Sequence, residues 1–311
     1  MALDEASASF LAQLEAAEGK PLQQMTPDEA REFGVFLAQL VGSGPELASV
    51  RDEALPTGDG GHFRVRVLTP AGAVGGVVVY YHGGGWVLGD IDEYDTLART
   101  LATRLGVAVV NVDYRLAPEH RYPAAVNDAW TALEWASERV TEIAGHPVPL
   151  IVMGDSAGGN LAAVVAQRAS KAGQPRVDAQ VLVYPVTDAD VEDETYRDPQ
   201  NQLLLTREGM IWFWDHYAPD PASRKNPDAS PLQANDLSGL PPAIVVTAEY
   251  DPLREEGEAY ADRMRAAGVP VEQQRFSGQM HHFFAMLNVL PGSAEAISYI
   301  ADKLCPRLAA D

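Results

Sequence analysis

A serine near two glycines is the strongest candidate for a catalytic residue in this sequence. Ser156 is the centre of Gly-Asp-Ser-Ala-Gly, after the apolar segment 149–153 and before the helix-forming segment 160–168. The first segment is typical of a buried strand and the second of a helix. A turn this tight leaves no room for side chains at Gly154 and Gly158, and glycine tolerates strained backbone angles. The pattern predicts a nucleophilic serine at a sheet edge, at the positive end of a helix; a purely structural Gly/Ser turn is the alternative.

Candidate partners for this serine follow two later strands. A serine hydroxyl is a weak nucleophile until a base takes its proton and a third group orients that base. His281 and His282 fall in the loop after the last predicted strand, and Asp251 directly follows a strand that ends near Tyr250. Catalytic residues of open α/β sheets gather at the carboxyl ends of strands. We therefore expect Asp251 and one of the two histidines to lie beside Ser156.

Other acidic and histidine side chains compete for these roles. An aspartate before a proline, such as Asp251, is more often a turn residue or a helix cap, and Asp188 also follows a strand. The other competitors fit strand-end positions less well: Asp228, His62, His120, His146 and His216.

A run of three glycines follows another predicted strand, in the segment 82–86, His-Gly-Gly-Gly-Trp. Backbone N–H groups in such a run can point at a substrate oxygen because no side chains intervene. Amide donors aimed at the oxyanion that forms when serine attacks a carbonyl stabilise the transition state. A phosphate-binding loop is the alternative, but neither G-K-[ST] nor the G-x-G-x-x-G spacing is present. The segment therefore predicts an oxyanion hole.

Composition narrows the classes of partner and compartment. The chain has 311 residues and a net charge of −21, from 23 basic and 44 acidic residues. This charge repels nucleic acid and anionic membranes, and it disfavours anionic substrates. The single cysteine, Cys305, excludes an internal disulfide. No apolar run approaches the roughly 18 residues of a membrane span, and the N-terminus is acidic, so we expect a cytoplasmic protein.

Strands alternate with helices along most of the chain. Alternation of this kind predicts a mainly parallel sheet covered by helices on both faces. The expected strands are 63–69, as an antiparallel edge, and 76–81, 107–112, 149–153, 179–184, 243–248 and 269–276. The expected helices are 94–105, 128–143, the segment after the serine, 253–267 and 293–308.

Two regions do not follow this alternation of strands and helices. Residues 1–45 predict two helices, the second starting with a capping box at Thr26 and Glu29. Residues 186–230 are acidic and rich in Asp, Pro and Asn, with one aromatic helix over 206–217. The insertion is expected to lie over the active edge of the sheet. The N-terminal helices either join such a cap or simply pack on the core.

Four motifs together resemble one known family. They are His-Gly-Gly-Gly-Trp at 82–86, Asp-Tyr-Arg-Leu-Ala-Pro-Glu-His at 113–120, Gly-Asp-Ser-Ala-Gly-Gly-Asn at 154–160 and Asp-Pro-Leu at 251–253. From about residue 60 to the end, the chain resembles the hormone-sensitive-lipase-like family of carboxylesterases. The resemblance implies an α/β-hydrolase fold, a helical cap and no cofactor. The expected division is a cap from 1–45 and 186–230, and a core from 46–185 and 231–311.

The resemblance also implies roles for individual residues. It assigns Ser156 as nucleophile, Asp251 as orienting acid and His281 as base. It assigns the oxyanion hole to the amides of Gly84, Gly85 and Ala157, with Gly83 as a flanking glycine, and gives segment 113–120 a supporting role. One departure is that the family commonly has His-Gly-Phe where this chain has His281-His282-Phe283. The second imidazole could perturb the ionisation of the base or the backbone of the loop.

The sequence thus predicts a carboxylesterase that hydrolyses neutral short- to medium-chain esters through a serine acyl-enzyme. An amidase or deacetylase with the same triad, or a non-catalytic small-molecule receptor on the same scaffold, remain alternatives. We expect no metal, no nucleic-acid partner and no membrane partner, and a homodimer is left open. Candidate pocket residues, each equally suited to plain packing, are Trp86, Tyr184, Leu205, Met210, Phe213 and Trp214.

Overall fold

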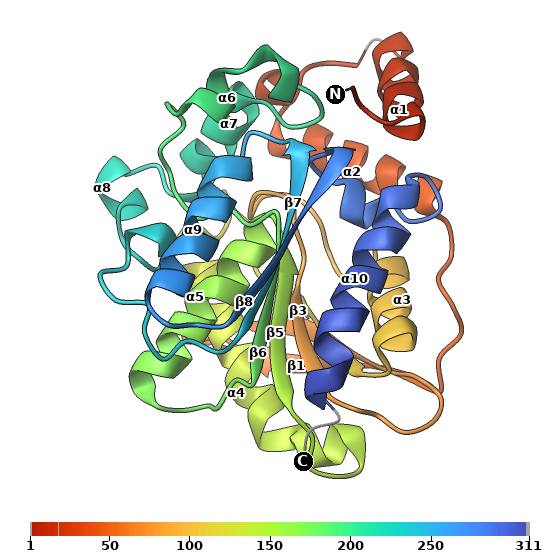
Figure 1. The fold of residues 1–311 in the computed structure, drawn as a ribbon, viewed down its shortest axis with the longest axis vertical. Coiled ribbons are helices and arrows are strands. Elements are labelled where there is room, and N and C mark those ends of the chain that lie inside the picture. Colours follow the sequence, from red (N-terminus) through yellow and green to blue (C-terminus); the bar gives the residue numbers. More distant parts are fainter. Residues whose placement is uncertain (1, 18, 309–311) are drawn as a thin grey trace.

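One eight-stranded sheet forms the centre of the computed structural model, which describes residues 2–17 and 19–308 (Figure 1). The strand order is β1-β2-β4-β3-β5-β6-β7-β8. The β1–β2 and β2–β4 pairs are antiparallel and the others are parallel, which confirms the predicted mainly parallel sheet. The strands are β1 Ser49–Pro56, β2 His62–Thr69, β3 Val77–Tyr81, β4 Ala108–Asp113, β5 Leu150–Asp155, β6 Ala179–Val183, β7 Ala243–Tyr250 and β8 Val271–Met280.

Helices cover both faces of this sheet, with α4, α5 and α9 on one face and α3 and α10 on the other (Figure 1). The α-helices are α1 Glu5–Ala16, α2 Pro27–Val41, α3 Asp95–Leu105, α4 Ala124–Ala144, α5 Ala157–Ala172, α6 Glu194–Arg197, α7 Arg207–Tyr217, α8 Pro221–Arg224, α9 Arg254–Ala266 and α10 Pro291–Leu308. The 3-10 helices are η1 Leu22–Gln24, η2 Pro199–Asn201, η3 Pro231–Gln233 and η4 Phe283–Ala285.

The two helical layers enclose two hydrophobic clusters, one on each side of the sheet. Successive side chains of a strand point to opposite faces, and a parallel sheet is apolar on both. In β3, Val77, Val79 and Tyr81 enter one cluster, whereas Val78 and Tyr80 enter the other. The continuous apolar runs of the sequence therefore mark strands buried on both faces.

A third group of helices lies over the carboxyl ends of the parallel strands. It combines α1 and α2 with α6 and α7, the latter two from the chain between β6 and β7 (Figure 1). Helix α2 begins with the predicted capping box, in which Glu29 N donates to Thr26 Oγ1 at 3.2 Å and Thr26 N donates to Glu29 Oε2 at 2.9 Å. The short helix η1 contacts α7, so the N-terminal region and the 186–230 insertion meet above the sheet.

Three expectations about the elements are wrong. Strand β8 ends at Met280 and not at 276. Segment 63–69 is antiparallel, but β1 pairs along its outer side, so β1 and not β2 is the edge strand. Strand β1 has no apolar pattern because most of its side chains are exposed and several are charged, as is usual at a sheet edge. Helix α4 begins at Ala124, earlier than the predicted 128. None of the helices in the described part of the chain has the length and apolar character that crossing a bilayer requires.

Candidate active site

Ser156 lies at the turn between β5 and α5, with its backbone in an uncommon conformation. Its φ is 55° and its ψ is −118°, a positive φ that non-glycine residues rarely adopt. A Cβ at Gly154 would be 2.2 Å from the carbonyl oxygen of Gly158, and a Cβ at Gly158 would be 1.9 Å from that of Tyr81. Both contacts are impossible, so the two glycines are required by close backbone approach, as the sequence predicted.

Ser156, His281 and Asp251 form a continuous hydrogen-bonded chain. His281 Nε2 is 3.0 Å from Ser156 Oγ, and His281 Nδ1 is 2.8 Å from Asp251 Oδ2. The Asp251 side chain is fully buried, and its Oδ1 accepts a bond from Leu253 N at 2.9 Å. A carboxylate beside Nδ1 favours the tautomer with the proton on that nitrogen, which leaves Nε2 free to accept the serine proton. The three residues follow β5, β7 and β8, so the expected meeting at the strand ends occurs.

The structure distinguishes the two adjacent histidines. Only His281 contacts the serine and the aspartate, whereas the His282 side chain is partly buried and lines the neighbouring cavity. The backbone of His282 has φ 73°, in the left-handed region that favours glycine. Burial, together with the adjacent His281, lowers the pKa of His282 to about 4. The second imidazole is therefore neutral near pH 7.

The glycine run forms a loop beside Ser156. Gly84 and Gly85 have φ values of 100° and 59°, and both line the same cavity as the serine. A Cβ would lie 2.2 Å from Leu88 O at the first and 2.1 Å from the Phe213 ring at the second. Within the described chain, neither glycine N–H donates to another backbone group. Ala157 is the first residue of α5, where helix N–H groups have no intrahelical partner.

A buried acid that the sequence analysis missed lies behind this loop. Asp155 Oδ1 accepts a 2.6 Å bond from the Tyr80 hydroxyl, and a Cβ at Gly83 would be 2.5 Å from Asp155 Oδ2. Burial raises the pKa of Asp155 to about 6. The Tyr114 hydroxyl donates to His82 O at 2.8 Å, and the two rings stack 4.3 Å apart. A charged residue at the end of an otherwise apolar strand was the available signal for Asp155.

Segment 113–120 supports the glycine loop from its other side. Ala117 N donates to Trp86 O at 2.9 Å, which connects the segment to the end of the loop. Arg115 forms a two-pronged pair with the buried Asp128, through Nε at 2.9 Å and Nη2 at 2.9 Å. These contacts agree with the supporting role that the family resemblance implied.

The serine opens onto a largely apolar cavity of about 680 Å³. Its wall combines α1, α2, the glycine loop and the segment from 202 to 213 with the loop after β8. The principal apolar lining residues are Leu14, Phe33, Leu37, Leu88, Leu205, Met210, Phe213 and Met286. The sequence did not identify the lining residues of α1 and α2, because an apolar helical stripe has the same pattern whether it covers a core or a cavity.

Three of the six candidate pocket residues do not line this cavity. Trp86 is fully buried and stacks on Tyr217, with ring centroids 4.2 Å apart, and Trp214 packs against it at 4.7 Å. Tyr184 lies beneath the ring of His281, with centroids 4.6 Å apart. These aromatic side chains belong to the packing that supports the site, whereas the other three candidates, Leu205, Met210 and Phe213, do line the cavity.

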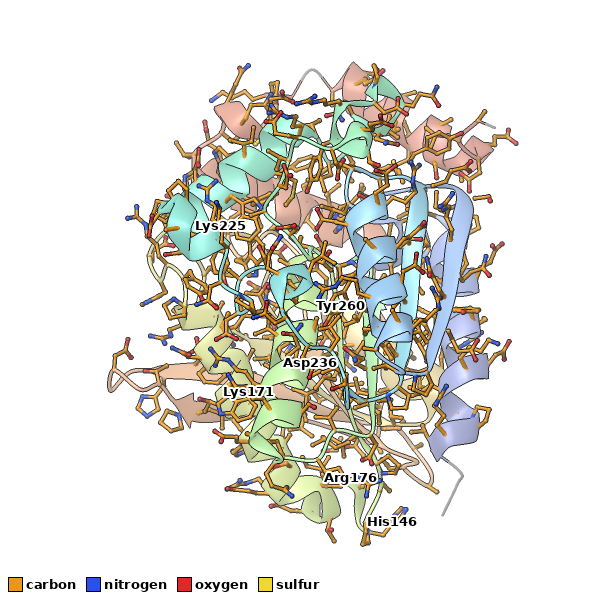
Figure 2. All side chains as sticks on the ribbon, turned by 60° about the vertical axis from the view of Figure 1, so that its left-hand side comes forward. His146, Lys171, Arg176, Lys225, Asp236 and Tyr260 are labelled. Atoms are coloured by element: carbon orange, nitrogen blue, oxygen red, sulfur yellow. The ribbon has the colours of Figure 1, made fainter. Side chains whose placement is uncertain are left out.

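The competing acids and histidines have other partners or other positions. Asp228 pairs with Arg168 at 2.7 Å, and Asp188 Oδ2 accepts from Gln233 at 2.6 Å. His146 lies at the end of the molecule opposite the N-terminal helices (Figure 2). Across residues 2–17 and 19–308, no cluster of His, Cys, Asp and Glu side chains is arranged to hold a metal ion.

The chain is similar to a known protein family, to curated ester hydrolases and to solved esterase structures. A family model described as the alpha/beta hydrolase fold matches residues 78–285. Carboxylesterase NlhH of Mycobacterium tuberculosis is 44% identical over 223 residues, covering 71% of this chain and 70% of that protein. The ethyl acetate hydrolase of Pseudomonas putida is 35% identical over 316 residues, covering 98% and 99%. The hyperthermophilic esterase of Pyrobaculum calidifontis superposes with a TM-score of 0.91 at 38% identity, covering all of both chains.

The sheet, its helical layers and the serine turn define an α/β hydrolase. Within this superfamily, the chain belongs to the hormone-sensitive-lipase-like carboxylesterases and is a carboxylic ester hydrolase.

Proposed function

We propose that the chain hydrolyses neutral short- to medium-chain carboxylic esters through an acyl-enzyme on Ser156. The observation that supports this most directly is the Asp251–His281–Ser156 chain of hydrogen bonds beside two glycine amides at the wall of an apolar cavity.

The proposed first step is attack of Ser156 Oγ on the ester carbonyl carbon. His281 Nε2 takes the hydroxyl proton, and the Asp251 carboxylate stabilises the resulting imidazolium. The negative charge on the carbonyl oxygen is met by N–H groups of the glycine loop and of Ala157, and losing one such donor typically lowers the rate about 10²–10³-fold. His281 then returns the proton to the departing alcohol, which leaves an acyl group on Ser156.

The second step repeats the chemistry with water. Water attacks the acyl carbonyl, His281 accepts its proton, and the carboxylic acid leaves as Ser156 regains its hydrogen. We further propose that residues 1–45 and 186–230 act as one cap, because η1 contacts α7 and residues of both regions line the cavity.

The test is labelling with a serine-reactive alkyl phosphonate, followed by peptide mass spectrometry. The label is expected on Ser156 alone, and Ser156→Ala should be unlabelled and retain less than about a thousandth of the esterase kcat. A matched control is Ser170→Ala, a partly buried serine near the end of the same helix α5, whose Oγ donates to Gly239 O at 3.0 Å. A folded protein that takes no label would instead indicate a non-catalytic receptor. Comparable turnover of matched anilides would indicate an amidase.

A further inference from the structure

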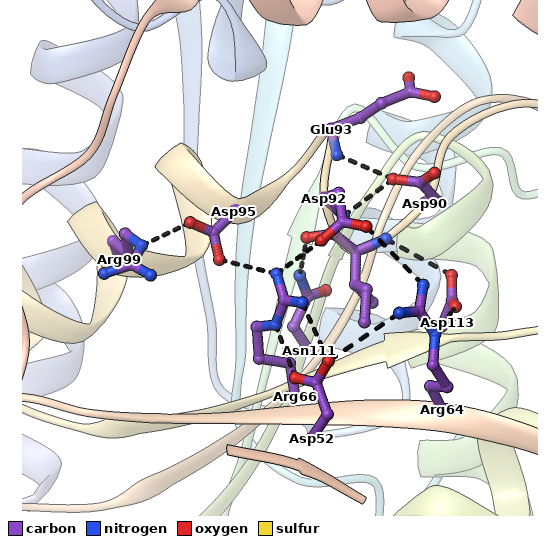
Figure 3. A network of polar contacts seen from close by, with 11 residues as sticks. Asp52, Arg64, Arg66, Asp90, Asp92, Glu93, Asp95, Arg99, Asn111 and Asp113 are labelled. Carbon is purple, nitrogen blue, oxygen red and sulfur yellow. Dashed lines mark hydrogen bonds and ion pairs between the residues drawn. The ribbon is translucent and has the colours of Figure 1, made fainter. Parts of the chain in front are cut away.

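Glu93 differs from its acidic neighbours because its carboxylate has no hydrogen-bond or ion-pair partner among the described residues. Asp92 and Asp95 both pair with Arg66, at 2.8 Å and 3.1 Å. Asp90 Oδ1 accepts hydrogen bonds from the backbone N–H groups of Asp92 and Glu93, each at 2.8 Å. Figure 3 shows the Glu93 side chain extending away from this network of arginines and aspartates. No described residue donates a hydrogen bond or an ion pair to the Glu93 carboxylate.

The space that holds this carboxylate is part of the cavity wall. Glu93 is half-buried and lines the cavity that Ser156 opens onto. A Cβ at Gly34, in the middle of α2, would be 2.8 Å from Glu93 Oε2. The missing side chain at Gly34 therefore leaves room for the carboxylate beneath α2. Burial, with Asp90 nearby, raises the pKa of Glu93 to about 7.

Among the described residues, the cavity wall holds no free cation to balance this group. The ammonium group of Lys20, the lysine among the described lining residues, is bonded to Glu29 at 2.6 Å. His281 is held by Asp251, and His282 is neutral near pH 7. A partly desolvated carboxylate in an apolar cavity gains most from a cation that is brought by the ligand.

We propose that Glu93 is a specificity-determining residue that binds the ammonium group of an amine-bearing ester. The proposal rests on the esterase function proposed above and extends its substrate class from neutral esters to esters that carry a cation away from the carbonyl. An ester whose apolar body fills the cavity and whose cationic end reaches Glu93 would gain affinity that an isosteric neutral ester lacks.

The test compares ester pairs that differ only in charge. It is run at pH 8, above the pKa of about 7 of Glu93, where Glu93 favours its carboxylate form. One pair has the cation on the alcohol side: acetylcholine and 3,3-dimethylbutyl acetate. The other pair has it on the acyl side: ethyl 4-(trimethylammonio)butanoate and ethyl 5,5-dimethylhexanoate. The measured quantity is the ratio of kcat/KM for the cationic ester to that for the neutral ester, by titration of released acid.

In Glu93→Gln, this ratio should fall about fivefold in at least one of the two ester pairs, because a partly exposed ion pair contributes about that much. Glu93→Lys should lower the ratio further, because it places a positive charge beside the cation of the ester. For wild-type protein, the same ratio should fall as salt is raised, because screening weakens the attraction. Glu32→Gln, which removes one charge from the exposed side of α2, should change the ratio less than about twofold.

Ratios that change less than about twofold in both Glu93 variants, or that ignore salt in wild type, would overturn the proposal while esterase activity stands. Wild-type protein that hydrolyses none of the four esters would instead refute the proposed function.

Discussion

His281 and His282 are adjacent, yet their side chains have different surroundings. The ring of His281 joins Ser156 to Asp251, whereas that of His282 lines the cavity and has no hydrogen-bond partner among the described residues. The backbone of His282 is in the left-handed region, with φ 73°. A glycine would adopt this conformation without strain, which explains why a glycine suits this position.

The two histidines should therefore respond differently to substitution. His281→Ala should lower kcat by several orders of magnitude, because it removes the only base in contact with Ser156 among the described residues. His282→Gly should keep substantial activity. Steady-state kinetics on a 4-nitrophenyl ester would compare the two, and the opposite pattern would contradict the assignment.

A matched pair of substitutions isolates the backbone strain at position 282. His282→Gly and His282→Ala both remove the imidazole, but only alanine must occupy a φ of 73° with a Cβ. We expect the alanine variant to be less stable than the glycine variant by about 1 kcal/mol in urea unfolding. Equal stabilities would mean that the loop relaxes when the ring is lost.

Asp251 should have an intermediate effect on turnover. Asp251→Asn preserves the shape of the side chain but replaces the carboxylate that fixes the proton on His281 Nδ1. We expect kcat to lie between the values for wild type and for His281→Ala, with an unchanged circular dichroism spectrum. Activity equal to wild type would show that another group orients the base.

Asp155 should make stability depend on pH in an unusual direction. Burial raises its pKa in the folded protein from 3.8 to about 6, so the folded state holds its proton in a range where the unfolded chain has lost it. The stability that this proton provides is fully present below about pH 4 and is lost as the pH rises through about 6. Asp155→Asn cannot titrate. From pH 4 to pH 7, the free energy of unfolding of wild type should therefore fall by a few kcal/mol relative to that of Asp155→Asn. A difference that is constant over this range would contradict the raised pKa.

Much of the sheet could be predicted because buried strands and helix ends have local signals. Continuous apolar runs marked β3, β4 and β5, and a left-handed glycine, Gly106, follows α3 at its predicted end. Strand β1 could not be predicted in this way. It is charged and mostly exposed, and its pairing with β2 depends on a partner, not on its own pattern.

The site was predictable where chemistry restricts residue type, and less so where packing decides. A serine between glycines and a run of three glycines need particular backbone shapes, so the sequence alone pointed to them. In contrast, whether an aromatic residue lines a cavity or supports it depends on tertiary contacts. Trp86 stacks on Tyr217 behind the glycine loop, although its type suited a pocket equally well. Glu93 gave no signal because acidic loop residues are usually solvated.

The cavity should limit the length of the ester that the protein accepts. The cavity of about 680 Å³ is roofed by α2 and by the segment 202–213, which should favour short to medium acyl chains in solution. Phe213 lies directly over Gly85, where a Cβ would be 2.1 Å from its ring. Phe213→Leu should therefore shift the acyl-chain optimum of 4-nitrophenyl esters toward longer chains, because it opens the space beside the serine.

The same substitution at Phe276, which packs on Phe283 outside the cavity, is the control and should leave the optimum unchanged. Under the proposal that residues 1–45 and 186–230 act as one cap over the cavity, adding an oil–water emulsion should not activate the wild-type protein strongly. Strong preference for emulsified long-chain triglycerides over dissolved short-chain esters would contradict the roofed cavity and point to a lipase that opens at interfaces.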